Sequence, residues 1–261
     1  MSERPTVLVV GATGSIGRLV VEEAIGDGYP VRALVRDVRR AGDLPDDAER
    51  VVGDLTRPET LKAAVDGVDA IVFTHGSYDG VEAGSEDVDY GGVRNVLRVL
   101  GGRRVRIALM TTIGVTSRSI TYAADAAWKR RGERLLRASG LPYTIVRPGW
   151  FDHNDADQHR LVFLQGDTRH AGDPSDGVVA RRQIAQVLLR SLTSSAAERK
   201  TFELVAERGP AQDDLDPLFA ELDDDPPGAV DAVRDAENLP LDEEPARVRS
   251  DLDAVRRGAG E

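Results

Sequence analysis

Cysteine is absent from this 261-residue sequence. Disulfides, thiolate catalysis and cysteine-ligated zinc or iron–sulfur centres are therefore excluded. Long apolar runs are absent too: residues 6–10 and Ala70–Phe73 are strand-sized, far short of the roughly 20 residues that a membrane helix needs. Residues 1–5 show no basic stretch followed by an apolar one, so we expect no secretory signal, no membrane contact and a cytoplasmic protein.

Acidic residues outnumber basic ones in this sequence, and the excess lies in one part of it. The formal net charge is −11, and residues 211–261 alone hold 16 Asp or Glu against 5 Arg, which leaves the rest of the chain neutral. An acidic protein without a basic stripe repels phosphate backbones, so we expect no nucleic-acid partner. We interpret the short basic cluster at residues 129–131 as one solvated helix face.

Short apolar strands alternate with helical stretches over the first 150 or so residues. Because each right-handed crossover places a helix over the sheet, this alternation predicts an α/β fold with a doubly wound parallel sheet, the Rossmann fold. The predicted strands are 6–10, Val31–Val35, 50–52, Ala70–Phe73, 106–111 and 143–146, and the predicted helices are 15–25, 58–65, 88–100 and Ala123–Ala138.

After Gly149 the pattern loosens into a stretch that we interpret as a substrate-side insertion, residues 151–183, with a strand at 161–164. A helix at 182–192 and a strand at 201–205 would complete an NAD(P)-binding domain over residues 1–206. Residues 207–261 form an acidic C-terminal segment, which we predict to be a small helical appendage with helices at 229–236 and 247–256.

A glycine-rich turn follows the first predicted strand and opens the first helix. Glycine permits the tight turn and the close approach of a pyrophosphate, and the helix N-terminus offers free N–H donors and the positive end of its dipole. Strand, turn, helix and second strand agree, so the turn predicts dinucleotide binding. The residues predicted to hold the phosphates are Gly11, Thr13, Gly14, Ser15, Ile16 and Gly17.

The residue after the second strand indicates which ribose is bound. NAD-binding proteins place a carboxylate there, whereas an arginine accommodates a 2′-phosphate. Arg36 stands at this place, about 20 residues beyond the last glycine as the fingerprint requires. We therefore predict NADP(H) as the preferred cofactor. The alternative is NAD(H), with Asp37 accepting from the ribose and Arg36 solvated.

Taken together, these residues resemble the atypical short-chain dehydrogenases/reductases, and specifically the NAD(P)H-binding, NmrA-like branch. The resemblance spans residues 5–205 and includes three further segments, which are residues 53–55, Asp89-Tyr90 with Gly92 and Asn95, and residues 139–149. It implies that Asp54 and Leu55 border the adenine, that Thr74 and His75 after the fourth strand and Pro148 contact the cofactor, and that Lys129 reaches the nicotinamide ribose.

The sequence departs from the family pattern at the proton donor. Classical members carry a tyrosine four residues before the lysine, whereas Asp125 stands there. We interpret Asp125 and Lys129 as a helix ion pair, with proton donation by a buried Asp125 as the alternative. Tyr122 lies two turns from Lys129 on the same face. Thr111 and Thr112 replace the usual serine, and a threonine hydroxyl can still hold a carbonyl oxygen.

Three other features could contribute to a site. His75 follows the fourth strand at the edge where open α/β sheets bind ligands. Trp150 and Phe151 could line a substrate pocket, although core packing explains them equally well. The acidic and histidine side chains of residues 152–159 match no metal-site spacing, so we expect a solvated loop and no metal.

The sequence thus predicts an NADP(H)-dependent oxidoreductase acting on a small organic carbonyl or conjugated substrate. Because the family's tyrosine is missing, one alternative is a non-catalytic dinucleotide sensor that binds a protein partner differently in its two states. A nucleotide-sugar epimerase-like enzyme is a third alternative, which the same missing tyrosine disfavours. The sequence does not indicate the substrate or the oligomeric state.

Overall fold

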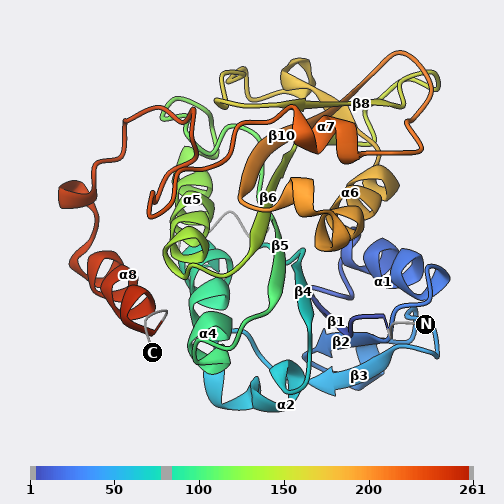
Figure 1. Cartoon of the computed structure of the whole chain (residues 1–261), viewed down its shortest axis with the longest axis vertical. Coiled ribbons are helices and arrows are strands. Elements are labelled where there is room, and N and C mark those ends of the chain that lie inside the picture. Colours follow the sequence, from blue (N-terminus) through green and yellow to red (C-terminus); the bar gives the residue numbers. More distant parts are fainter. Residues whose placement is uncertain (1–3, 78–83, 259–261) are drawn as a thin grey trace.

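A computed structural model describes residues 4–77 and 84–258 of the chain. Its strands are β1 (Val7–Val10), β2 (Val31–Val35), β3 (Glu49–Val52), β4 (Ala70–Phe73), β5 (Arg106–Met110), β6 (Tyr143–Pro148), β7 (Trp150–Phe151), β8 (Arg160–Leu164), β9 (Val178–Val179) and β10 (Lys200–Glu207). Its helices are α1 (Gly17–Gly26), α2 (Lys62–Val65), α4 (Gly91–Leu100), α5 (Ala123–Ala138), α6 (Arg181–Thr193), α7 (Asp216–Ala220) and α8 (Ala246–Gly258). Helices cover both faces of one central sheet (Figure 1).

The sheet confirms the predicted Rossmann fold. Its main strands run in the order β3-β2-β1-β4-β5-β6-β10, each parallel to its neighbour. β8 and β9 pair antiparallel with β10, and β7 continues beside β9. The strand order reverses between β1 and β4, where open α/β sheets bind ligands outside the carboxyl ends of their strands.

Alternate residues of β1 enter two different cores. Val7 and Val9 pack with α1 and α6 on one face, whereas Leu8 and Val10 pack with α2, α4 and α5 on the other. All four side chains are fully buried. A strand that is buried on both faces has a continuous run of apolar residues. This run is why the strand could be predicted from the sequence.

Several predicted elements differ in detail. The helix predicted at 58–65 divides into a 3-10 turn at Pro58–Thr60 and α2, and α4 begins only after a π-helical segment at Ser85–Tyr90. The two-residue strands β7 and β9 and the short helix α7 were not predicted. The helix predicted at 229–236 is wrong, because that segment is irregular, whereas α8 lies where the last helix was predicted.

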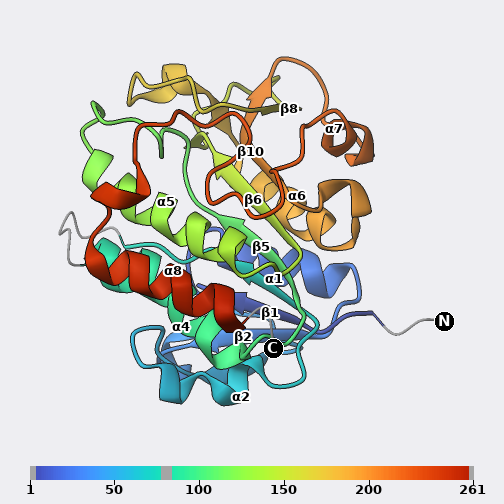
Figure 2. The same ribbon diagram turned by 60° about the vertical axis from the view of Figure 1, so that its left-hand side comes forward.

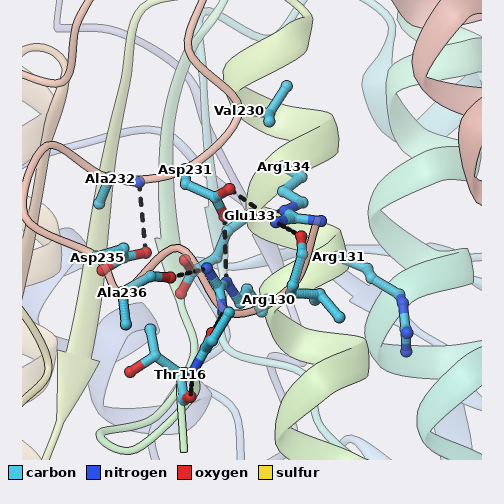
Figure 3. Close-up of polar contacts among 12 residues, drawn as sticks. Thr116, Arg130, Arg131, Glu133, Arg134, Val230, Asp231, Ala232, Asp235 and Ala236 are labelled. Carbon is cyan, nitrogen blue, oxygen red and sulfur yellow. Dashed lines mark hydrogen bonds and ion pairs between the residues drawn. The ribbon is translucent and has the colours of Figure 1, made fainter. Parts of the chain in front are cut away.

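The acidic C-terminal segment folds back over α5, and α8 lies beside α4 and α5 (Figure 2). Arg130 and Arg134 of α5 are each 1% exposed and donate to Asp231 (Figure 3). Arg134 also donates to Glu244. The prediction of one solvated face at residues 129–131 is therefore wrong. Carboxylates of the segment cover Arg130 and Arg131, and Lys129 pairs with Asp89 instead. No helix within the described residues is long and apolar enough to cross a membrane.

Candidate functional site

The glycine turn after β1 lies directly against the loop that follows β4. Gly11 has a φ of +86°, and a Cβ there would lie 2.7 Å from the backbone nitrogen of His75. A Cβ on Gly17 would lie only 2.0 Å from the Gly11 carbonyl oxygen. The Gly14 N–H donates to that same oxygen at 2.9 Å. Only residues without a side chain permit this path, which leaves the backbone at the mouth of α1 open to a ligand.

A cavity of about 410 Å³ opens beside this turn, at the point where the strand order reverses. Of the residues predicted to bind the cofactor, it is lined by Gly11, Thr13, Gly14, Ser15, Ile16, Arg36, Asp54, Leu55, Thr74 and His75. Gly17 lies behind the turn and Pro148 is buried in β6, so neither lines this cavity. The side-chain amide of Asn95 holds the Leu55 carbonyl at 2.7 Å and so fixes the wall opposite the turn.

Charge in the first cavity is concentrated at the end of β2. Arg36 is exposed and lines the cavity. The carboxylate of Asp37 accepts from the backbone N–H of Arg39 at 3.0 Å and pairs with the Arg39 guanidinium at 2.9 Å. Burial alone would raise the pKa of Asp54, but hydrogen bonds from Thr56 and the charges of Arg36 and Arg57 outweigh it, so this pKa lies below its ordinary value.

A second cavity of about 420 Å³ adjoins the first, and His75 and Ser77 line both. It gathers all the residues that were predicted to be catalytic, which are Thr111, Thr112, Tyr122, Asp125 and Lys129. Trp150 and Phe151 also line it, and the Tyr122 and Trp150 rings meet edge to face with centroids 6.4 Å apart. The two cavities thus place the predicted cofactor residues next to the predicted catalytic ones.

The predicted ion pair between Asp125 and Lys129 is wrong. The Lys129 ammonium instead donates to Asp89 Oδ1 at 2.7 Å, and the Asp89 side chain is 2% exposed. The π-helical segment brings Asp89 toward α5, within reach of Lys129. Asp125 Oδ1 lies 2.7 Å from the hydroxyl of Ser85, which belongs to the same segment.

The two threonines after β5 differ in their hydroxyl contacts. The Thr111 hydroxyl donates to the buried carboxylate of Glu133 at 2.7 Å, so its proton is engaged away from the cavity. The Thr112 hydroxyl makes only a 3.2 Å contact with the neighbouring Ile113 carbonyl. Thr112 is therefore the better placed of the two to donate to a substrate oxygen.

His75 separates the two cavities. Both of its ring nitrogens are buried without a hydrogen-bond partner in the described part of the chain. Burial lowers the pKa of His75 to about 4, with the charge of Asp89 opposing the shift. The imidazole is therefore neutral near pH 7.

The acidic side chains of the loop at residues 152–159 lie close to arginines of the same protein. Asp152 pairs with Arg181, and Asp155 and Asp157 lie within 3.9 and 3.7 Å of Arg208. Within residues 4–77 and 84–258, the structure gathers no group of three or more side chains able to hold a metal ion.

A family model described as NAD(P)H-binding matches residues 11–195, which cover both cavities and the sheet from the glycine turn to the end of α6. The chain belongs to this family. Its fold and motifs fit an atypical short-chain dehydrogenase/reductase. The family residues thus include the turn, Arg36 and the whole of α5.

Three proteins illustrate what the chain is similar to. It is 31% identical to the photosystem II assembly factor Ycf39 of Cyanophora paradoxa over 78% of its own length, and it spans 64% of that protein. It is 25% identical to sanguinarine reductase of Eschscholzia californica over 85% of this chain and 97% of that one. A putative NAD-dependent epimerase/dehydratase from Bacillus halodurans has the same fold, with a TM-score of 0.70, 22% identity and coverage of 84% and 100%.

Several side chains around the second cavity carried no functional prediction. Asp89 belonged to the resemblance without a role, and its pairing with Lys129 depends on the π-helical segment, which has no recognisable sequence signal. Ser77 and Ser85 stand in no motif. Glu133 stands in no motif either, and its side chain is fully buried.

Proposed function

We propose that this protein is an NADP(H)-dependent oxidoreductase that reduces a small organic substrate bearing a carbonyl or a conjugated double bond. The observation that carries the proposal is the pair of adjoining cavities that meet at His75 and Ser77. One is lined by a dinucleotide-type turn, and the other is walled by aromatic and apolar side chains with a few polar groups, as small-molecule sites are.

The residues of the first cavity fit a dinucleotide. A glycine turn that no Cβ could occupy suits a pyrophosphate, and Arg36 suits a 2′-phosphate. Asp37 is engaged by Arg39, which argues against its serving as the acceptor for an unphosphorylated ribose. These features support NADP(H) over NAD(H).

A bound dinucleotide would supply a hydride, and the protein's task is to place the substrate and provide a proton. Lys129, held by Asp89, lies where it can orient the nicotinamide ribose. The Thr112 hydroxyl can donate to the substrate oxygen. Trp150 and Phe151 help to exclude water from the second cavity.

A non-catalytic, NmrA-like dinucleotide sensor is the second candidate, favoured by one observation: Asp125 stands where the family's tyrosine would be. Such a sensor must bind a protein partner with different affinity when NADPH is bound. An epimerase-like activity lacks the same tyrosine and has no observation in its favour.

Calorimetric titration with NADP⁺, NADPH, NAD⁺ and NADH tests the cofactor, and loss of NADPH absorbance with quinones, aldehydes and conjugated imines tests the reaction. We expect NADPH to bind more tightly than NADH and at least one substrate class to be turned over. Absence of binding by all four nucleotides would overturn the proposal. NADPH binding without turnover, together with NADPH-dependent capture of a partner, would favour the sensor.

A further inference from the structure

The side chain of Arg181, the first residue of α6, contacts a residue of each cavity. α6 and α1 lie side by side on one face of the sheet (Figure 1). The Arg181 Nε donates to the hydroxyl of Ser15 at 3.2 Å, and Ser15 lines the first cavity. The same guanidinium lies over the ring of Phe151, 5.3 Å from its centroid, and Phe151 lines the second cavity. One basic side chain therefore bridges the glycine turn and the aromatic wall.

This position corresponds to the middle of a dinucleotide. A dinucleotide that occupies both cavities, as in the proposed function, has its pyrophosphate between its two nucleoside halves. In a Rossmann fold the pyrophosphate belongs at the glycine turn and the N-terminus of the first helix. Ser15 belongs to that turn, so Arg181 contacts the part of the first cavity that suits the pyrophosphate.

The glycine turn contributes no charged side chain of its own. Residues 11–17 are glycine, alanine, threonine, serine and isoleucine, so the turn offers an anion only N–H and hydroxyl groups and the dipole of α1. Arg36 lies at the end of β2, where it suits a 2′-phosphate. A guanidinium forms strong bidentate hydrogen bonds with phosphate oxygens. Arg181 therefore supplies, beside the turn, the positive charge that the turn lacks.

The ion pair between Arg181 and Asp152 leaves the guanidinium able to move. Asp152 Oδ1 accepts from the backbone N–H of Arg181 at 2.9 Å, while Oδ2 pairs with the guanidinium. The carboxylate therefore keeps a partner when the arginine side chain turns away. The two side chains are 36% and 47% exposed, and pairs that are exposed in this way contribute little to stability. A phosphate can therefore compete with Asp152 for the guanidinium.

We propose that Arg181 binds the pyrophosphate of the dinucleotide, exchanging its ion pair with Asp152 for the phosphate oxygens. The inference rests on the proposed function and adds a second arginine to the cofactor site. Arg36 and Arg181 then have different tasks. Arg36 recognises the 2′-phosphate that distinguishes NADP(H), whereas Arg181 recognises a group that NAD(H) carries as well.

Calorimetric titration of the full chain with NADPH and NADH separates these tasks. Arg181→Ala removes a charge-assisted hydrogen bond to a group that both nucleotides share. We therefore expect it to raise the Kd of both by the same factor, roughly tenfold or more, and to leave the preference between them unchanged. Arg181→Lys keeps the charge without the planar fork, so its loss should be smaller.

The matched control is the next residue of α6. Arg182 is exposed and pairs with Glu22 and Glu23 of α1, so Arg182→Ala removes the same charge from the same end of the helix. Its Kd for NADPH should stay within about twofold of wild type, because it contacts no residue of the glycine turn within residues 4–77 and 84–258. Equal weakening by Arg181→Ala and Arg182→Ala would indicate a general effect of charge and would overturn the inference.

Asp152→Asn should act in the opposite direction. The amide oxygen can still accept from the backbone N–H of Arg181, but the competing negative charge is gone. NADPH should therefore bind more tightly, by up to about fivefold. If Arg181 served only to hold Asp152 in place, both Asp152→Asn and Arg181→Ala would weaken binding, and that result would overturn the inference.

The remaining outcomes distinguish the two proposals. A wild type that binds neither NADPH nor NADH would overturn the proposed function. A wild type that binds NADPH, with Arg181→Ala binding it equally well, would overturn only the role of Arg181. Weakening of NADPH without weakening of NADH would place Arg181 at the 2′-phosphate and would likewise overturn its assignment to the pyrophosphate.

Discussion

The guanidinium of Arg147 on β6 lies 2.6 Å from the carboxylate of Glu133 on α5, and both side chains are completely shielded from solvent. The same carboxylate accepts from the Thr111 hydroxyl at 2.7 Å and from Arg137 at 3.2 Å. Arg147 in turn pairs with Asp235 of the acidic segment at 2.7 Å. A connected polar network therefore links the wall of the second cavity to the C-terminal segment.

Glu133→Ala should destabilise the protein strongly. Breaking a buried pair by removing one partner typically costs ~3–5 kcal/mol, because the remaining charge stays buried without compensation. Arg147 and Arg137 would both lose a partner here. Urea unfolding measures the change. The control is Glu59→Ala, whose 3.2 Å pair with Arg57 is exposed and should contribute less than about 1 kcal/mol. Equal losses in the two variants would contradict this account.

Two neighbouring glutamates of the acidic segment should behave differently. Glu244 is fully buried and pairs with Arg131 at 2.6 Å and Arg134 at 2.7 Å, so Glu244→Ala should cost ~3–5 kcal/mol and make the segment more sensitive to protease. Glu243 is exposed and 3.9 Å from Arg118, so Glu243→Ala should change stability by less than about 0.5 kcal/mol. Thermal melts and limited proteolysis measure both effects.

Replacing glycine by alanine should destabilise the protein at the first residue of α1 and stabilise it at the last. Gly17→Ala would drive a Cβ into the Gly11 carbonyl, so we expect a loss of about 1–3 kcal/mol or more and loss of dinucleotide binding. Gly26→Ala meets no atom within 4 Å and should stabilise the protein by about 0.5–1 kcal/mol. Denaturation and NADPH titration provide the measurements, and similar behaviour of the two variants would refute the geometry of the turn.

Arg36→Ala should change cofactor choice. A charge-assisted hydrogen bond is worth about 1.5–3 kcal/mol, so we expect NADPH to bind roughly 10- to 100-fold more weakly and NADH to be affected less than about twofold. Arg98→Ala, an exposed arginine on α4, is the control and should alter neither. Calorimetry gives both constants. Equal weakening of NADPH and NADH would show that Arg36 does not contact a 2′-phosphate.

Glu203 should make stability depend on pH. Burial raises its pKa from 4.5 to about 7, although Arg147 opposes the shift. The folded protein therefore holds this proton more tightly, and the stability gained below pH 4.5 is lost as pH rises through about 7. Glu203→Gln stays neutral, so its stability relative to wild type should rise by on the order of 2 kcal/mol between about pH 5 and about pH 8.

The control for this experiment lies on the same strand. Glu207 is 46% exposed and pairs with Arg160 at 2.5 Å, so Glu207→Gln should show little change across the same pH range. Urea unfolding at the two pH values provides the comparison. A flat difference between wild type and Glu203→Gln would contradict the raised pKa of Glu203.

The sheet could be predicted from the sequence because its strands are buried on both faces. Runs such as Val31–Val35 and Ala70–Phe73 can be predicted to be strands from their apolar residues alone, and the glycine turn marks the start of α1. Strands of two residues, such as Trp150–Phe151, are too short to show a pattern, and their pairing depends on partners far along the chain. Prediction therefore succeeded where the information is local.

The errors at the site share one physical cause. A helix ion pair between Asp125 and Lys129 is what i,i+4 spacing favours, but a carboxylate that folding brings from the π-helical segment competes better for the ammonium. The arginines of α5 looked solvated because the carboxylates that cover them lie about 100 residues later, as with Asp231 and Arg130. Long-range electrostatic pairing cannot be read from local spacing.

The docking of the acidic segment also constrains how the chain folds during synthesis. Arg134 is buried against Asp231 and Glu244, and Arg147, which also pairs with Glu133 and Glu203, gains Asp235 from this segment. A nascent chain emerges from its N-terminus, so the glycine turn and most of the sheet are made before these partners exist. Until residues 231–244 have been synthesised, Arg130 and Arg134 of α5 therefore lack the carboxylates that cover them in the folded protein.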